Sequence, residues 1–241
     1  MNAEALISFY REWLGFRDYY SIILNSQKSQ NNEFCQHPGL LSGVEPTYGT
    51  ITAGLTTRSG DQRIDVPVWF GDAEAAQRKI IVFGLEPRDT NPMFNIERTG
   101  NRMFGAPFGA DRWNAGSTVR GKAQNKYFRV FNDVIDQKDT FILFSDIVKF
   151  YKIIDAENRD RVNDTYAREH FIRHASESLP MLKKEISLID PSHIITLGND
   201  SYRFIKKLLP NLKDIIKGIR HPANGGERKA KEQLGVLLRK A

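Results

Sequence analysis

Side chains that can exchange hydrogen bonds and protons follow four short apolar runs of the sequence, each at the point where the run ends. They are Glu86 and Asp89 after residues 80–84, Ser145 and Asp146 late in residues 141–148, Asn199 after residues 193–198, and His221 after residues 215–220. The carboxyl ends of strands in an open parallel sheet meet at one edge, and ligands bind in the crevice outside that edge. The sequence therefore predicts a ligand site built from four strand ends.

The segment His221-Pro-Ala-Asn-Gly-Gly226 is the most specific of these strand ends. A proline directly after the histidine restricts the backbone, and two glycines after Asn224 allow a backbone to approach a ligand closely. Asn199 and Asp200 are less specific, because both residue types are also common at helix starts. The histidine segment is therefore the strongest single indication of a site.

The four apolar runs alternate with segments that have helical periodicity, at residues 125–136, 164–188, 201–209 and 227–239. This alternation is typical of a parallel sheet covered by helices on both faces. We expect an α/β protein with three α/β/α layers and a central four-stranded, mostly parallel sheet. It is preceded by an N-terminal helix over residues 3–24 and by a β-hairpin, residues 48–56 and 63–70, joined by a turn at 58–61.

No stretch of the sequence has the composition of a linker, so we expect one domain over residues 1–241, with 1–77 as an extension of a 78–241 core. The sequence has no apolar run long enough to span a bilayer, and its N-terminal segment carries charges unlike a signal peptide. We therefore expect a cytoplasmic protein without a membrane partner. The net charge of +6 favours a polyanionic partner such as nucleic acid.

Cys35 is the only cysteine of the 241 residues, which excludes an internal disulfide, a cysteine-based zinc site and a four-cysteine iron–sulfur cluster. His170 and His174 have the i, i+4 spacing of a metal site on a helix. No third ligand lies nearby, so we interpret the pair as part of a charged helix face. We expect neither a metal nor another cofactor.

Four segments together resemble motifs of the uracil-DNA glycosylase superfamily, in the family's order: Gly84-Leu-Glu-Pro87, Gly105-Ala-Pro-Phe108, Leu197-Gly198 and His221-Pro-Ala223. The resemblance covers about residues 78–240. The sequences of Gly105-Ala-Pro-Phe108 and of residues 182–198 look most like those of the thermostable iron–sulfur branch of this superfamily. That branch holds its cluster with four cysteines, so this chain would be a cluster-free relative.

The resemblance implies an enzyme that hydrolyses the bond between a deaminated or modified base and deoxyribose in DNA repair. His221 would donate a hydrogen bond to the base carbonyl that gains negative charge, and Glu86 would orient the attacking water, with Asp89 as the alternative. Phe108 would stack on the extruded base. The remaining residues expected to line the base pocket are Gly84, Pro87, Ser145, Asn199 and Asn224.

Asp146 stands where the family usually has an asparagine that recognises the uracil edge. An ionised aspartate only accepts hydrogen bonds, whereas an asparagine also donates them. Three interpretations follow from this substitution. The preferred base carries an exocyclic amine, or Asp146 is protonated, or the alignment shifts by one residue and Ser145 faces the base.

Arg220, Arg228 and Arg112 are the basic residues that we expect to contact the DNA backbone, the first two because they flank His221. We expect the protein to act as a monomer on DNA. Two other functions fit the same residues. One is a protein that binds nucleic acid or a nucleotide without cleaving it, and the other is a hydrolase of small nucleosides.

Overall fold

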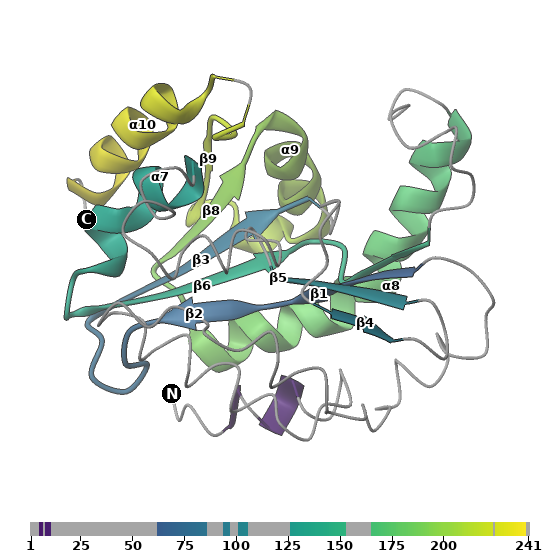
Figure 1. Ribbon diagram of the computed structural model, residues 1–241, viewed down its shortest axis with the longest axis horizontal. Coiled ribbons are helices and arrows are strands. Elements are labelled where there is room, and N and C mark those ends of the chain that lie inside the picture. Colours follow the sequence, from purple (N-terminus) through teal and green to yellow (C-terminus); the bar gives the residue numbers. More distant parts are fainter. Residues whose placement is uncertain are drawn as a thin grey trace.

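The computed structural model describes residues 5–6, 8–10, 62–85, 94–96, 101–105, 126–152, 165–223 and 225–239. Its centre is a five-stranded sheet in the order β2-β6-β3-β8-β9 (Figure 1). The strands are β2 (Val68–Phe70), β6 (Thr140–Asp146), β3 (Arg78–Gly84), β8 (His193–Leu197) and β9 (Ile216–Ile219). The predicted α/β fold is confirmed: four strands are parallel, and β2 adds a fifth, antiparallel strand at the β6 edge.

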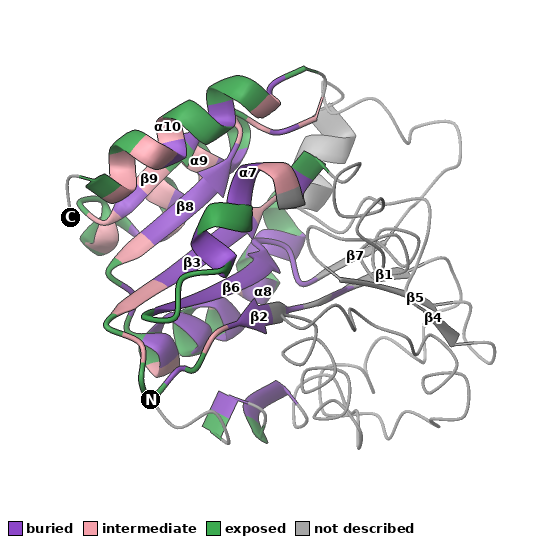
Figure 2. Ribbon diagram, turned by 60° about the vertical axis from the view of Figure 1, so that its left-hand side comes forward, coloured by how far each residue is buried: buried purple, intermediate pink, exposed green. Residues whose placement is uncertain are grey.

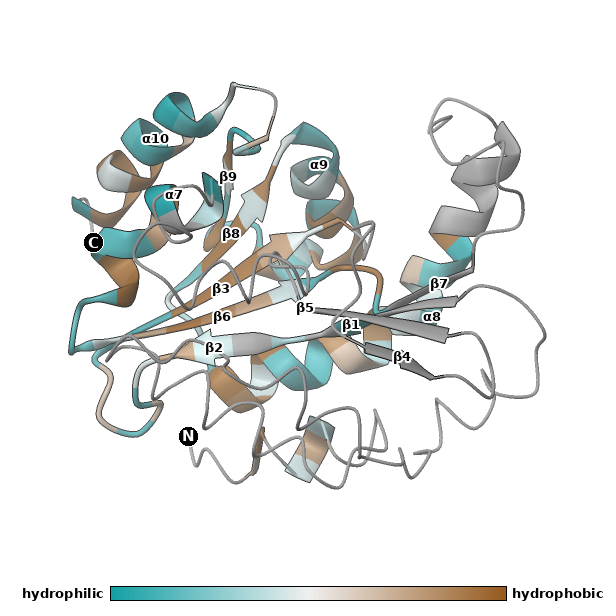
Figure 3. Cartoon of the chain, viewed as in Figure 1, coloured by the Kyte–Doolittle hydropathy of each residue, from teal (hydrophilic) through white to brown (hydrophobic). Residues whose placement is uncertain are grey.

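The central strands have apolar sequences and are enclosed in the protein. Helices cover both faces of the sheet, and neighbouring strands pair with both edges of each central strand. All seven residues of β6 are buried, as are Ile80–Phe83 of β3 (Figure 2). In Figure 3 the same strands are largely coloured as hydrophobic, whereas hydrophilic and hydrophobic residues alternate along α10. A strand buried on both faces has a continuous apolar sequence instead of an alternating one, which is why these strands could be predicted.

Four helices connect and cover the strands, close to the predicted bounds: α7 (Lys126–Ile135), α8 (Thr165–Ile189), α9 (Asn199–Leu208) and α10 (Glu227–Arg239). The right-handed crossovers of parallel strands place α7 on one face and α8 and α9 on the other. The helix α10 packs against α7, and Arg129 of α7 pairs with Glu227 of α10. The described elements therefore form the expected α/β/α layers.

A second sheet, in the order β4-β5-β1-β7, corrects the predicted hairpin. Its strands are β4 (Phe94–Ile96), β5 (Asn101–Gly105), β1 (Gln62–Val66) and β7 (Phe150–Lys152). The strand β1 pairs with β5 on one side and with β7 on the other. Residues 48–56, the predicted first strand of the hairpin, lie outside the described residues. Pro67 separates β1 from β2, and β2 joins the main sheet instead.

The N-terminal helix prediction is confirmed only for the residues that the structure describes. Residues 5–6 and 8–10 are helical, and Leu6, Phe9 and Tyr10 are buried against the core. Tyr10 stacks against Trp69 of β2, with ring centroids 6.1 Å apart. The rest of the predicted 3–24 helix lies outside the described residues.

Candidate functional site

The order of the parallel strands places a switch point between β3 and β8. From β3 the chain crosses through α7 to β6 on one side, and from β8 it crosses through α9 to β9 on the other. Ligand crevices of open α/β sheets form outside the carboxyl ends of strands at such a point. The parallel register brings Gly84, Asp146, Gly198 and His221 to one edge of the sheet, as the sequence predicted. We call this edge, at the switch point, the strand-end edge.

His221 lies directly beyond β9, and its half-buried ring is fixed by local contacts. The backbone N–H of Ala223 donates to Nδ1 of His221 at 3.1 Å. A ring nitrogen that accepts a hydrogen bond carries no proton, so the neutral imidazole has its proton on Nε2. The ring of Tyr127 in α7 packs edge-on against it, with centroids 5.9 Å apart. The arrangement makes Nε2–H a preorganised donor.

The two glycines behind His221 are each required by the local backbone. Gly225 adopts a positive φ of 76°, which favours glycine. A Cβ on Gly226 would lie 2.1 Å from the backbone oxygen of His221. Gly226 therefore allows the start of α10 to pack directly against the His221 backbone. Asn224 lies outside the described residues.

Asp146 ends β6 beside Gly84 of β3, and its side chain is buried, with 6% exposed. Its Oδ1 lies 2.0 Å from where a Cβ on Gly84 would stand, so the carboxyl group occupies the space that this glycine leaves free. Burial raises the pKa of Asp146 well above its usual value, and the nearby Asp65 raises it further. The structure thus favours a protonated Asp146 among the three interpretations of this residue.

Behind Asp146 lies a buried lysine cluster, which we define as Lys149, Asp65, Glu185, Ser145 and Tyr10. The Lys149 Nζ contacts Asp65 Oδ2 at 3.2 Å and Glu185 Oε1 at 2.7 Å, and it also contacts the Ser145 hydroxyl. The Tyr10 hydroxyl donates to Glu185 Oε1 at 2.6 Å. The three charged side chains are at most 1% exposed. The cluster joins β1, α8, the N-terminal helix and the end of β6.

The electrostatics of the buried lysine cluster keep Lys149 charged. Burial alone would lower the pKa of Lys149, but Glu185 and Asp65 outweigh it and raise that pKa. Burial raises the pKa of Asp65 to about 6, against the opposing effect of Lys149. A lysine held as an ammonium cannot take a proton from Ser145, so the pair is not an activated nucleophile.

Ser145 belongs to this cluster and not to the strand-end edge. Its hydroxyl lies 3.0 Å from Asp65 Oδ2 and 3.1 Å from Glu185 Oε1, and the residue is 1% exposed. The structure therefore gives no support to the alignment in which Ser145 faces the base. Alternation of strand residues explains the difference, because consecutive side chains point to opposite faces.

Sequence reasoning missed Asp65, Lys149 and Glu185. Lys149 lies 84 residues from Asp65 and 36 residues from Glu185 in the chain. One signal was available. Glu185 occupies the same helix face as the buried Leu182, Ile186 and Ile189, where a lone carboxylate requires a partner. His174 was also misjudged: it is buried, and its Nδ1 lies 3.5 Å from Glu177 Oε2.

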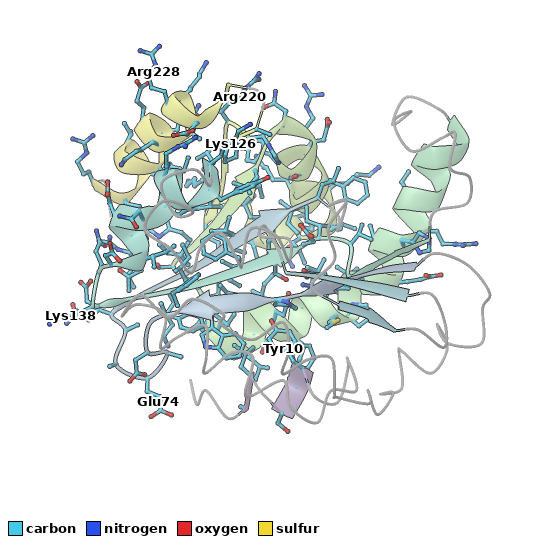
Figure 4. All side chains as sticks on the ribbon, in the orientation of Figure 1. Tyr10, Glu74, Lys126, Lys138, Arg220 and Arg228 are labelled. Atoms are coloured by element: carbon cyan, nitrogen blue, oxygen red, sulfur yellow. The ribbon has the colours of Figure 1, made fainter. Side chains whose placement is uncertain are left out.

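Three predicted site residues are exposed at or near the strand-end edge: Asn199 at the start of α9, Arg220 after β9 and Arg228 in α10. Figure 4 shows Arg220 and Arg228 in the upper part of the view with Lys126, and Lys138 farther down at the left edge. The other predicted site residues lie outside the described residues; they are Glu86, Pro87, Asp89, Phe108, Arg112 and Asn224.

No protein-family model and no curated protein matches this chain. No described helix has both the length and the apolar character needed to cross a membrane. In the same described part, no three His, Cys, Asp or Glu side chains are grouped in a way that could hold a metal ion. The functional assignment therefore depends on the geometry of the strand-end edge.

Gly226→Ala tests the packing that positions His221. We expect it to lower the free energy of unfolding by about 1–3 kcal/mol, because the added Cβ meets a backbone oxygen that must shift. Gly235→Ala in the same helix is the control: its Cβ would meet only the end of Arg239 at 3.6 Å, and the change should be neutral or stabilising. Thermal and denaturant unfolding measure both. Equal stability of the two variants would contradict the packing.

Lys149→Met tests the buried lysine cluster. Removing the ammonium leaves Asp65 and Glu185 buried without a counter-charge, so we expect a loss of about 3–5 kcal/mol in the free energy of unfolding. Lys231→Met is the matched control. Its exposed pair with Asp133 should contribute at most about 1 kcal/mol. A Lys149 variant as stable as the control would refute the ionised cluster.

Proposed function

We propose that this protein is a DNA glycosylase that hydrolyses the N-glycosidic bond of a deaminated or modified base, uracil or a related base. The observation that carries the proposal is the preorganised Nε2–H of His221 at the switch-point edge. The acceptor contact of Nδ1 leaves this ring a neutral donor, which is the form that a departing base anion needs. The motif order along the chain supports the same assignment.

The chemistry requires charge stabilisation at two places. The base departs with negative charge, while the sugar develops positive charge and is attacked by water. A fixed donor aimed at the oxygen that gains negative charge contributes about 10²–10³ in rate. His221 has the chemistry for this role, and the edge-on Tyr127 ring and the buried Pro222 hold it in place.

The water-activating group and the stacking ring come from segments that follow described strands. Glu86 stands two residues after the end of β3, and Asp89 follows it as the alternative. Phe108 stands three residues after the end of β5, at the end of Gly105-Ala-Pro-Phe108. We assign Glu86 to orienting water and Phe108 to stacking on the base, on the strength of the family resemblance. Pro87, Asn199 and Asn224 complete the proposed pocket.

DNA binding is assigned to exposed arginines beside His221. Arg220 directly precedes the histidine, and Arg228 lies in the first turn of α10, with 92% of its side chain exposed. Such residues contact phosphates without regard to sequence, which suits an enzyme that must scan DNA for a rare base. Arg112 remains part of the same proposal.

A second candidate function is binding without cleavage. The observation that favours it is Asp146, which stands where the resembled family recognises uracil with an asparagine. A protein with this edge could hold a base or nucleotide and leave the glycosidic bond intact.

His221→Ala tests the catalytic assignment. The protein is incubated in excess with oligonucleotides that carry uracil, hypoxanthine, xanthine or hydroxymethyluracil, and abasic sites are detected by alkaline cleavage. We expect the variant to lose about 10²–10³ in single-turnover rate, with DNA binding retained. His193→Ala is the control, because His193 begins β8 at the opposite edge of the sheet. Retained cleavage by His221→Ala would refute its role.

The same panel separates the candidate functions. Survival of every lesion while the oligonucleotides stay bound would favour the binding protein. Cleavage of free nucleosides but not of DNA would favour a nucleoside hydrolase.

Arg220→Ala and Arg228→Ala test the DNA-binding surface. Each should weaken binding to any DNA sequence and reduce the slope of log affinity against log salt by about one, because one phosphate contact is lost. Lys138→Ala is the control, since Lys138 is exposed and lies just before β6, at the opposite end of that strand from Asp146 (Figure 4). Fluorescence anisotropy across a salt series measures the slopes. Equal slopes for all three variants would remove these arginines from the interface.

A further inference from the structure

We propose that Asp146 is a neutral carboxylic acid at neutral pH and that its proton determines which base edge the site accepts. The protonation depends only on the groups around Asp146. The recognition of the base rests on the proposed function.

The charges at the end of β6 favour a bound proton. Three carboxyl groups approach one another there, from Asp65 in β1, Asp146 in β6 and Glu185 in α8, and Lys149 supplies one ammonium. Arg or Lys side chains other than Lys149 make no contact with these carboxyls in the described part of the chain. All three carboxyls ionised would leave two uncompensated negative charges shielded from water, which is costly. A proton on one of the three groups removes one of these two charges and so lowers that cost.

The hydrogen bonds favour Asp146 as the group that holds the proton. Asp65 Oδ2 accepts from Lys149 Nζ and from the backbone N–H of Asp146 at 3.0 Å. Glu185 Oε1 accepts from Lys149 Nζ and the Tyr10 hydroxyl. These donors stabilise the ionised forms of Asp65 and Glu185. Within the described residues, the Asp146 carboxyl forms no ion pair.

The pKa values agree with this assignment. The pKa of Asp65 is raised to about 6, whereas that of Asp146 is raised well above its usual value by burial and then by Asp65 itself. The charge of an ionised Asp65 opposes the ionisation of Asp146, and Lys149 offsets only part of that effect.

A neutral carboxyl group has the hydrogen-bonding capacity of an amide at this position. It accepts through its carbonyl oxygen and donates through its hydroxyl, whereas an ionised carboxylate only accepts. The edge of uracil presents a ring N–H beside a carbonyl and needs both capacities. Protonated Asp146 therefore supports uracil recognition, and ionised Asp146 favours a base whose edge presents donors.

The space around the carboxyl group shows why it stays at this edge. The absence of a side chain at Gly84 gives room for Asp146 Oδ1, and the contact from Asp65 to the Asp146 backbone holds the end of β6. Gly84 is also the last residue of β3, beside the switch point. Asp65, Lys149 and Glu185 are thus positioning residues for Asp146.

The first test measures the proton without any substrate. In protein labelled with ¹³C at aspartate carboxyls, Asp146→Asn identifies the Asp146 signal by its loss, and the signal is followed through a pH titration. We expect the chemical shift of a neutral acid at pH 7. An ionised Asp146 at that pH would overturn the inference.

Stability gives a second readout with a defined sign. Because the folded-state pKa is raised, the native protein binds more protons than the unfolded chain, so the stabilising effect of protonation is present at low pH and is lost as pH rises above about 4. Asp146→Asn removes this contribution, and its melting temperature should fall less with rising pH than that of the unaltered protein. Asp136→Asn, an exposed change at the end of α7, should follow the unaltered protein. Parallel curves for the unaltered protein and Asp146→Asn would contradict the inference.

Base recognition by Asp146, the second part of the proposal, is tested by the pH profile of uracil release. Uracil release by the unaltered protein should decline as Asp146 ionises, whereas Asp146→Asn keeps both donor and acceptor and should retain release at high pH. Identical profiles would overturn base recognition by Asp146. A neutral Asp146 with no release of any base by either protein would support the protonation, and would overturn the recognition together with the proposed glycosylase function.

Discussion

The contact of Lys149 with Asp65 and Glu185 is the interaction on which the arrangement of the described elements depends. It joins β1 of the second sheet, the end of β6 in the main sheet and the long helix α8, and Tyr10 adds the N-terminal helix through Glu185. Backbone contacts reinforce it, since the Asp65 N–H donates to the Lys149 carbonyl at 2.8 Å. Among the described strands the two sheets share no ladder, and this buried contact joins them beside the chain links at Pro67 and at residues 147–149.

Buried ion pairs seldom add net stability, because removing charges from water costs about as much as their attraction returns. Packing is a more general source of stability here, as the enclosed strands β3, β6 and β8 show. What the cluster adds is position and charge. It holds the end of β6 against β1, and its two carboxyl groups add to the effect of burial in raising the pKa of the neighbouring Asp146.

Two side chains at the strand-end edge, His221 and Asp146, are positioned in different ways. His221 is oriented within its own loop, by the Ala223 N–H and by the close packing that Gly226 permits. Asp146 is set by groups from distant parts of the chain. In the proposed glycosylase His221 stabilises the departing base and Asp146 recognises it, so catalysis and base specificity could change independently.

The sequence by itself determined the four parallel strands and the four helices, because enclosed strands and amphipathic helices have characteristic local spacings of apolar residues. It also determined that the carboxyl ends of the strands lie at one edge of the sheet. It also singled out Asp146 and His221 from their places after apolar runs. Only the tertiary structure decided the partners of β1, the buried lysine cluster and the reason for Gly226. Strand pairing and charge compensation join residues that are far apart in the chain, and no local pattern records which distant partner a strand edge or a buried charge will find.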